Sequence, residues 1–443
     1  MKSNGWRTVP ISELCEAIYD GPHATPKKID SGPIFLGISN LVDGRLNLSN
    51  TNHLSEKDFV KWTKRVTPRA DDIVFSYETR LGEAALIPEG LKCCLGRRMA
   101  LMRPNLEKTD PRFLLYAYLG PDFQNTIRAR TVYGSTVNRI LLTEFPSYPI
   151  TVPSLDEQKE IAHILGTLDD KIKLNRQMNH TLEGMARAIF KSWFIDFDPV
   201  YAKLDGHQPF GMNAKTSALF PNSFEESPLG KIPKGWKVRK LVEITTKIGS
   251  GATPRGGSKV YVDDGISLIR SQNVYDYEFR RHGLAHITEE IAKQLKNVVV
   301  KPDDILLNIT GDSILRTCVV DPSVLPARVN QHVSIIRAMP GIPCRYLHLN
   351  LVNPQMKSLL LGFDTGATRK AVTKGQLEAV PILMPSDEVL YTFDKITQFW
   401  FRRIQSNLLE SRTLSSIRET LLPKLLSGTI RVNEAEKVLE AVA

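Results

Sequence analysis

The sequence has little that marks an exported, membrane-bound or disulfide-linked protein. Its first ten residues have no apolar core and no cleavage signal, so we expect no secretory leader. No stretch approaches the roughly 18 consecutive apolar residues that a membrane-spanning helix needs. Five cysteines are scattered over 443 residues without the paired spacing of a zinc site, and an odd number does not suit a disulfide framework. We therefore expect a reduced, cytoplasmic, multidomain protein.

The sequence also lacks the motifs by which enzymes modify or cut DNA. Gly249-Ser250-Gly251 could belong to a nucleotide-binding loop, but Thr253-Pro254 follows where a helix should begin. Asn353-Pro354-Gln355-Met356 lacks the second proline and the stacking aromatic of an amino-methyltransferase motif. Asp71-Asp72 and Asp303-Asp304 are interpreted as turn residues before strands, because no acid-x-Lys pattern of a metal-dependent nuclease follows them. We predict no catalytic residues, no metal ligands and no cofactor bound by this chain.

The composition is that of an ordinary globular protein with an excess of positive charge. Hydrophobic residues make up 42% and charged residues 24%, which excludes disordered, collagen-like and purely coiled-coil chains. There are 58 Lys and Arg against 48 Asp and Glu, a formal net charge of +10. This excess favours a polyanionic partner.

The chain contains a tandem repeat. Segments of the first half return in the second half after 228 to 232 residues. The matched pairs are Gly5-Trp6 with Gly235-Trp236, Ala24-Thr25-Pro26 with Ala252-Thr253-Pro254, Asp71–Phe75 with Asp303–Leu307, Gly134–Thr136 with Gly366–Thr368, and Pro149-Ile150 with Pro381-Ile382. This period is far longer than the roughly 20–50 residues of a solenoid unit. Each copy is therefore predicted to be a domain with its own core, in a pseudo-twofold molecule with two binding surfaces.

Each copy begins with a domain of α/β (α+β) character. Short apolar runs bounded by turn residues, such as Ile34–Leu36 and Ile266–Ile269, predict strands. Short helices are predicted at Pro111–Leu119 and Arg345–Val352. The fold class we expect is two tandem α/β modules, each followed by a long helix.

The long helices are predicted from a change of period. Leu155–Phe194 contains no proline, and its apolar residues recur at steps of three and four through about four heptads. A second such stripe runs from about Asp387 to Leu426. We expect the two helices to pair as an antiparallel coiled coil, with Asn175 and Asn407 at matching positions where a polar residue fixes the register. The alternative is that each helix packs only on its own domain.

These patterns divide the chain into six segments. They are a first α/β domain (1–154), a long helix (155–195), a crossover linker (196–234), a second α/β domain (235–386), a second long helix (387–427) and a C-terminal tail (428–443). The linker is rich in proline, and we expect Phe197, Tyr201 and Phe210 to order it by lying on the helices. The first α/β domain has 20 basic and 16 acidic residues, a balance of +4, and the second has 20 and 13, a balance of +7.

Polar and basic residues gather in the predicted loops of both α/β domains. Arg, Asn and Gln can hydrogen-bond to guanine and adenine edges, whereas Lys contacts mostly position the DNA backbone. The DNA-binding residues predicted in the first domain are Thr25, Lys27, Lys28, Tyr77, Arg80, Arg97, Arg98, Tyr133, Ser135, Thr136, Asn138 and Arg139. Those predicted in the second are Thr253, Arg255, Lys259, Arg270, Asn273, Tyr275, Asn308, Gln331, Thr365, Thr368, Arg369 and Lys370. The prediction depends on their joint placement, since any one alone is an ordinary solvated side chain.

Several motifs around the helices and domain starts match a known family. They are Pro153-x-x-x-Glu157-Gln158-x-x-Ile161-Ala162, Leu168-Asp169-x-x-Ile172, Trp193-Phe194-x-Asp196-Phe197-Asp198-Pro199, Leu229-Gly230-x-Ile232-Pro233-x-Gly235-Trp236 and Leu421–Gly428. Through them the chain resembles the specificity subunit of type I restriction–modification systems over essentially its whole length. The sequence departs from the pattern at the start of the second helix, where Val389 follows Glu388 in place of Gln.

The resemblance implies a subunit without an active site that reads double-stranded DNA. Each α/β domain would be a target recognition domain for one half of a split, asymmetric sequence, and the paired helices would set the gap. Two modification subunits would bring S-adenosylmethionine, and two restriction subunits would use ATP and Mg. No membrane partner is implied. The alternatives are a self-contained DNA-modifying enzyme and a coiled-coil adaptor without a DNA role.

Overall fold

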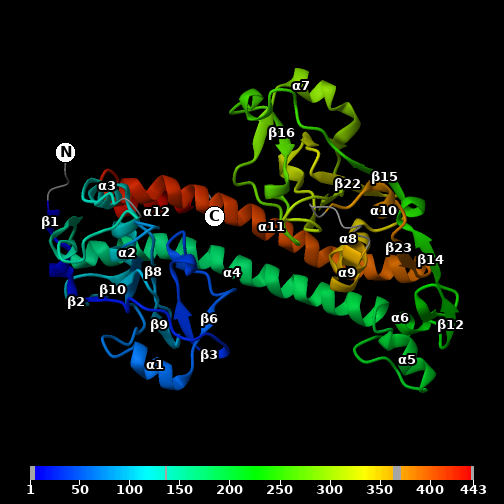
Figure 1. Cartoon of the computed structure of the whole chain (residues 1–443), viewed down its shortest axis with the longest axis horizontal. Coiled ribbons are helices and arrows are strands. Elements are labelled where there is room, and N and C mark those ends of the chain that lie inside the picture. The colour runs from blue at the N-terminus through cyan, green and yellow to red at the C-terminus, as the bar shows by residue number, and fades with distance from the viewer. Residues whose placement is uncertain (1–4, 135–136, 363–370, 441–443) are drawn as a thin grey trace. The chain divides into compact units, whose positions relative to one another are not determined.

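The chain forms two compact units in the computed structural model, which describes residues 5–134, 137–362 and 371–440 (Figure 1). Unit 1 comprises Met1–Gln177 and Ser406–Ala443, and unit 2 comprises Met178–Gln405. Each unit therefore contains one β-rich domain and a share of both long helices. Each is described below by itself.

Unit 1 is built on a four-stranded antiparallel sheet with the strand order β2-β10-β7-β8. A second sheet has the order β6-β3-β9, and β1 pairs with β11. Its strands are β1 (Arg7–Pro10), β2 (Cys15–Asp20), β3 (Ile29–Leu36), β4 (Leu41–Val42), β5 (Arg45–Leu46), β6 (Asn52–His53), β7 (Ile73–Ser76), β8 (Ala84–Leu86), β9 (Cys93–Leu95), β10 (Met99–Pro104) and β11 (Pro149–Val152). Its short helices are α1 (Glu56–Trp62), α2 (Pro111–Leu119), α3 (Pro121–Ala129) and α12 (Val432–Glu440).

Unit 2 repeats this topology, with one more strand in its second sheet. Its four-stranded sheet has the order β15-β22-β19-β20, a second sheet has the order β17-β16-β21-β18, and β14 pairs with β23. The strands are β14 (Lys237–Lys240), β15 (Thr245–Ser250), β16 (Ile266–Ile269), β17 (Ala285–Ile287), β18 (Val299–Val300), β19 (Ile305–Asn308), β20 (Thr317–Val319), β21 (Ala327–Val329), β22 (Val333–Ala338) and β23 (Pro381–Met384). The helices are α7 (Glu289–Gln294), α8 (Cys344–Val352), α9 (Pro354–Gly362) and α10 (Lys374–Glu378). The predicted duplication and the mixed α/β class are confirmed.

A buried Asp–Arg pair lies on the main sheet of each unit. In unit 1, Arg103 donates from Nε and Nη2 to the two carboxylate oxygens of Asp72 at 2.9 and 2.8 Å. In unit 2, Arg337 donates to Asp304 in the same way, with both distances 2.7 Å. In both units a backbone N–H three residues earlier donates to the same carboxylate. The aspartates are 1% and 0% exposed, so these are structural ion pairs of the core.

The preceding aspartates have the turn role that the sequence predicts. Asp71 and Asp303 are exposed and take positive φ angles of 66° and 65° just before their strands. Aspartate tolerates this left-handed region better than most residues because its short side chain can hydrogen-bond locally. Among the described residues, no group of His, Cys, Asp and Glu side chains is arranged to hold a metal ion.

The two predicted long helices are α4 (Leu155–Phe194) and α11 (Asp387–Leu426), each with 40 residues. Within unit 1, Asp169 of α4 meets Arg418 of α11, and Asn175, further along α4, meets Glu410, which lies earlier in α11. The two helices are therefore antiparallel there. The predicted pairing is confirmed, and the alternative in which each helix packs only on its own domain is wrong.

Asparagine occupies the predicted polar positions of this helix pair. Asn175 and Asn407 are both fully buried. The Asn175 amide donates to Oε2 of Glu410 at 2.9 Å and to Oγ of Ser411 at 3.3 Å. A buried amide that needs these partners favours one register over the others, since a slipped pair would leave it unsatisfied.

The linker between the repeats is folded. It contains α5 (Asp198–Leu204), α6 (Ala214–Ala218) and the hairpin β12–β13 (Phe224–Ser227, Gly230–Pro233). Phe197 packs on the core of unit 2, and the Tyr201 ring lies against Phe224 in a tilted arrangement with ring centres 4.6 Å apart. Phe210 is fully exposed, so the prediction that it lies on the helices is wrong. It lies in the loop between α5 and α6, where most neighbouring residues are also exposed.

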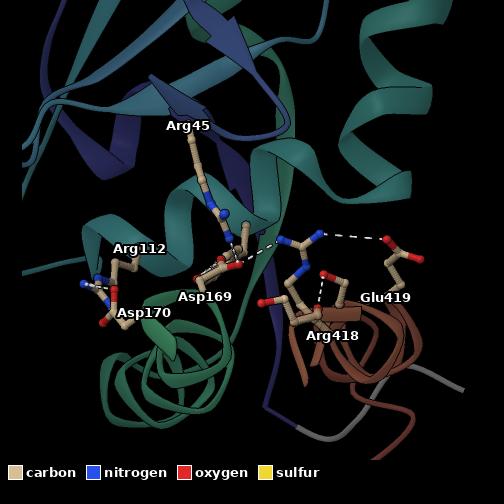
Figure 2. Close-up of polar contacts among 9 residues, drawn as sticks. Arg45, Arg112, Asp169, Asp170, Arg418 and Glu419 are labelled. Atoms are coloured by element: carbon tan, nitrogen blue, oxygen red, sulfur yellow. Dashed lines mark hydrogen bonds and ion pairs between the residues drawn. The ribbon is translucent and has the colours of Figure 1, made fainter. Parts of the chain in front are cut away.

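In unit 1 the α/β domain is fixed to the helices by an ionic cluster around Asp169 (Figure 2). Arg45 of β5 and Arg418 of α11 both donate to Oδ1 of Asp169, the latter at 2.8 Å. The Tyr116 hydroxyl donates to Oδ2 at 2.8 Å. Burial alone would raise the pKa of Asp169, but the two guanidinium groups and their hydrogen bonds outweigh it and hold the pKa below its ordinary value.

We expect Asp169→Asn to destabilise unit 1 by roughly 2 kcal/mol, because it leaves two arginines without their counter-charge. A carboxylate whose folded pKa is depressed stabilises the fold fully above its unfolded pKa of about 4, and this contribution is lost as the pH falls through the folded pKa. The variant should therefore lose part of the acid dependence of unfolding. Asp170→Asn is the matched control, since Asp170 and Arg112 form a more exposed pair. Equal effects of the two variants in urea unfolding would contradict the prediction.

Candidate nucleic-acid interface

Three segments of unit 1 meet at one end of its main sheet. They are the loop after β7, the turn between β9 and β10, and residues 132–134 and 137–140. The backbone N–H of Tyr77 donates to the carbonyl of Arg98 at 3.2 Å, and that of Ile140 donates to the carbonyl of Tyr77 at 2.8 Å. A β-bridge joins Glu78 to Arg139. These three segments are far apart in sequence, and the hydrogen bonds hold them together as one exposed group of loops. We call this group the frame.

Unit 2 builds the same frame. The backbone N–H of Ile309 donates to the carbonyl of His332 at 2.9 Å, and that of Val372 donates to the carbonyl of Ile309, also at 2.9 Å. A β-bridge joins Thr310 to Ala371. Each of these contacts is the repeat partner of one in unit 1, so the duplication preserves the frame.

The side chains on the two frames differ. In unit 1, Arg98 donates from Nη1 to the Thr79 hydroxyl at 3.1 Å and pairs with Glu78 at 3.1 Å. Nearby, His23 lies 2.7 Å from Asp20 through Nε2 and 3.5 Å from the Tyr77 hydroxyl through Nδ1.

In unit 2 the frame carries a chain of four polar side chains. The Thr253 hydroxyl contacts Oε1 of Gln331, whose Nε2 lies 3.0 Å from Nε2 of His332. Nδ1 of His332 lies 2.6 Å from the Thr310 hydroxyl. The chain thus connects three loops of unit 2.

Most of the remaining predicted residues that the structure describes are exposed on loops. In unit 1 these are Thr25, Lys27 and Lys28 between β2 and β3, Arg97 in the β9–β10 turn, and Tyr133, Asn138 and Arg139 among residues 132–134 and 137–140. In unit 2 they are Arg255 and Lys259 between β15 and β16. Arg80 is half-buried and donates to the carbonyl of Ile38 at 3.1 Å and to Glu83 at 3.1 Å.

Two further predicted residues of unit 2 make cation–π contacts. The Tyr275 ring lies 3.7 Å from the guanidinium of Arg280 and 4.6 Å from that of Arg316. Arg270 lies 5.3 Å from the Tyr261 ring and donates to the carbonyl of Gly283. The positive charges of these arginines therefore interact partly with aromatic rings of their own domain.

Three predicted residues are buried and cannot reach DNA in this structure. Asn273 and Asn308 are fully buried, and their amides donate to backbone carbonyls of neighbouring loops. Tyr77 is 6% exposed. Its burial and the nearby Asp20 raise its pKa, so the phenol stays neutral. The prediction of DNA contacts is corrected for these three, which support the loops instead.

Six predicted residues lie outside the described part of the chain, namely Ser135, Thr136, Thr365, Thr368, Arg369 and Lys370. Two residues of the frame were missed. Glu78 and Thr79 orient Arg98, and the repeat could have revealed them, because Glu78 corresponds to Thr310 at the 232-residue offset.

Comparisons with known proteins agree with this architecture. A family model described as the type I restriction modification DNA specificity domain matches residues 3–184. The specificity subunit of the type I restriction enzyme HindI from Haemophilus influenzae is 26% identical over 75% of this chain and 80% of its own length. The MjaIX specificity subunit of Methanocaldococcus jannaschii is 26% identical over 86% of this chain and 82% of its own length. The chain is therefore similar to the specificity subunits of type I restriction–modification systems.

The fold agrees with this similarity. The crystal structure of the type I restriction–modification S subunit from M. genitalium superposes with a TM-score of 0.57, at 16% identity, over 96% of this chain and 97% of that one. The matched family model and the relatives named above are those of DNA specificity subunits. We call the α/β domain of unit 1 recognition domain 1 and that of unit 2 recognition domain 2. Within the described residues no helix is long and apolar enough to span a membrane.

Proposed function

We propose that the two recognition domains read the two halves of a split, asymmetric DNA sequence. The observation that carries this proposal is the repeated loop frame, which has the same backbone contacts in both domains but different side chains on them. One frame presents Arg97 and Arg98, and the other presents Gln331 and His332. Frames with the same backbone structure would place both domains on DNA in the same orientation. Different side chains on them would select different bases.

Within this proposal the exposed predicted residues form the DNA surface. The lysines and Arg255 would contact phosphates, whereas Asn138, Arg139 and the turn residues would face base edges. Ser135, Thr136, Thr365, Thr368, Arg369 and Lys370 belong to the same proposed surface by their place in the sequence. Both recognition domains carry a positive balance, which suits a polyanion.

The helices are proposed to set the gap between the half-sites and to dock two modification subunits. Those subunits would carry S-adenosylmethionine and methylate adenine, and two restriction subunits with ATP and Mg would complete the complex in the cytoplasm. The proposal is supported by the family and by the division of both 40-residue helices between the two units.

The test is to co-express the chain with the modification subunits of its source organism in a host without adenine methylation, and to sequence the methylome. We expect methylation at one two-part motif with an unspecified gap. The purified chain alone should transfer no methyl group, which distinguishes the proposal from a self-contained modifying enzyme. A complex that forms and methylates without any sequence motif, or a chain that binds no modification subunit, would overturn it.

A further inference from the structure

The turn before the last strand of each main sheet has the same length and the same anchor in both recognition domains. Three residues, Gly96–Arg98, separate β9 from β10, and three residues, Asn330–His332, separate β21 from β22. The carbonyl of the third residue accepts a backbone hydrogen bond from the neighbouring loop in both cases, at 3.2 and 2.9 Å. The middle residues, Arg97 and Gln331, are therefore equivalent positions.

The third residue of each turn holds it in place. Arg98 contacts Thr79 and Glu78, and His332 contacts Thr310, all from the loop after the central strand of the sheet. The side chains of Arg98 and His332 are half-buried. Their hydrogen-bonding groups are thus engaged within the domain, which leaves the middle residue as the exposed one.

Arg97 is exposed, and its guanidinium has no hydrogen bond or ion pair with any described residue. Its planar fork of donors is therefore available to an outside partner. Guanine offers two adjacent acceptors, O6 and N7, in the major groove, and a free guanidinium matches them with two parallel hydrogen bonds.

Gln331 is also exposed, but its amide is held. With the amide oriented as in the structure, its oxygen accepts from the Thr253 hydroxyl and one N–H donates to Nε2 of His332. Nδ1 of His332 then carries the proton and donates to Thr310. One N–H and one oxygen lone pair of the Gln331 amide remain free to bind a partner, and the contacts with Thr253 and His332 fix their direction. This donor and acceptor pair matches N7 and N6 of adenine in the major groove.

We infer that residues 97 and 331 are the corresponding base-reading positions of the two recognition domains, with Arg97 selecting a guanine and Gln331 selecting an adenine. The inference rests on the proposed function and adds the base class and the residue for each half-site. Thr79, Arg98, Thr310 and His332 act as positioning residues.

The reciprocal variants Arg97→Gln and Gln331→Arg test it in the complex with the modification subunits. Arg97→Gln should lower the preference for guanine at one position of its half-site by roughly 5- to 150-fold, the range expected for one bidentate base contact. Gln331→Arg should replace adenine by guanine at one position of the other half-site. Gln294→Arg adds the same charge on an exposed residue of α7 in recognition domain 2, and should leave the motif unchanged.

Thr310→Val removes the hydroxyl that holds His332 and keeps the shape of the side chain. It should relax the choice of adenine while the melting temperature stays unchanged, which a merely structural role would not produce. Where a variant gives too little methylation to read, binding of the complex to duplexes with single base changes gives the same information. A loss of affinity that is equal for all sequences would mean a phosphate contact and would overturn the inference.

The methylome of the wild-type complex shows whether the proposed function or only this inference has failed. A two-part motif in its methylome supports the proposed function whatever the variants do. A motif without guanine in the first half-site or without adenine in the second overturns the inference alone, as does an unchanged motif in both reciprocal variants. A wild-type complex that methylates without any motif overturns both.

Discussion

Asp304→Asn is expected to destabilise recognition domain 2 by about 3–5 kcal/mol, the usual cost of breaking a buried ion pair. The carboxylate is fully buried and accepts two hydrogen bonds from Arg337, both at 2.7 Å. Asparagine has nearly the same shape, but it removes the negative charge and places an amide N–H against a guanidinium donor. Hydrogen–deuterium exchange of β19 and β22, which Asp304 and Arg337 join, measures the loss locally, because a two-unit chain need not unfold in one step.

The neighbouring residue provides the control. Asp303 is exposed and has a φ angle of 65°, a conformation that asparagine also tolerates. Asp303→Asn should therefore change stability by less than about 0.5 kcal/mol. The same comparison can be made in recognition domain 1 with Asp72 and Asp71. If β19 and β22 are as well protected from hydrogen–deuterium exchange in Asp304→Asn as in Asp303→Asn, the Asp–Arg pair does not stabilise the sheet.

The long helices could be predicted to their ends because every local signal agrees. Leu155–Phe194 has a heptad stripe that is apolar except at the buried asparagines, no internal proline, and acidic residues in its first turn. The second helix also ends where expected, although Pro423 lies within its last turn. Antiparallel pairing followed from the tandem repeat, since a duplicated helix with one apolar stripe most simply buries that stripe against its own copy.

The site was less predictable, because a polar residue in a loop can face either solvent or backbone. Asn273 was predicted to bind DNA, yet it accepts from the backbone of Arg270 and donates to that of Arg280. Asn40 is also buried and does the same in recognition domain 1, with Gly37 and Asn47 as its partners. A polar residue retained in both copies therefore indicates the shared loop structure, and residues that differ between the copies, such as Arg97 and Gln331, are the better candidates for specificity.

Inserting seven residues of coiled-coil sequence into both long helices is expected to lengthen the gap of the DNA motif by about three base pairs. The insertions belong after Gln177 in α4 and after Gln405 in α11, where each helix passes from one unit to the other. Seven residues add about 10 Å of helix and preserve the heptad phase of the apolar stripe. Since DNA rises about 3.4 Å per base pair, the added length corresponds to about three base pairs. Both half-sites should stay the same, because neither recognition domain is altered.

Two further insertions show whether the helices act as a spacer. An insertion in α4 alone changes its length against α11, so that the contacts of Asn175 with Glu410 and those of Ala186 with Phe401 cannot both form. Such a variant should lose stability and methylation together. Four residues in each helix shift the stripe out of heptad phase and should be tolerated less well than seven. If the seven-residue double insertion methylates the original motif with its original gap, the helices do not set the spacing, and the gap must be determined by the partner subunits or by the recognition domains themselves.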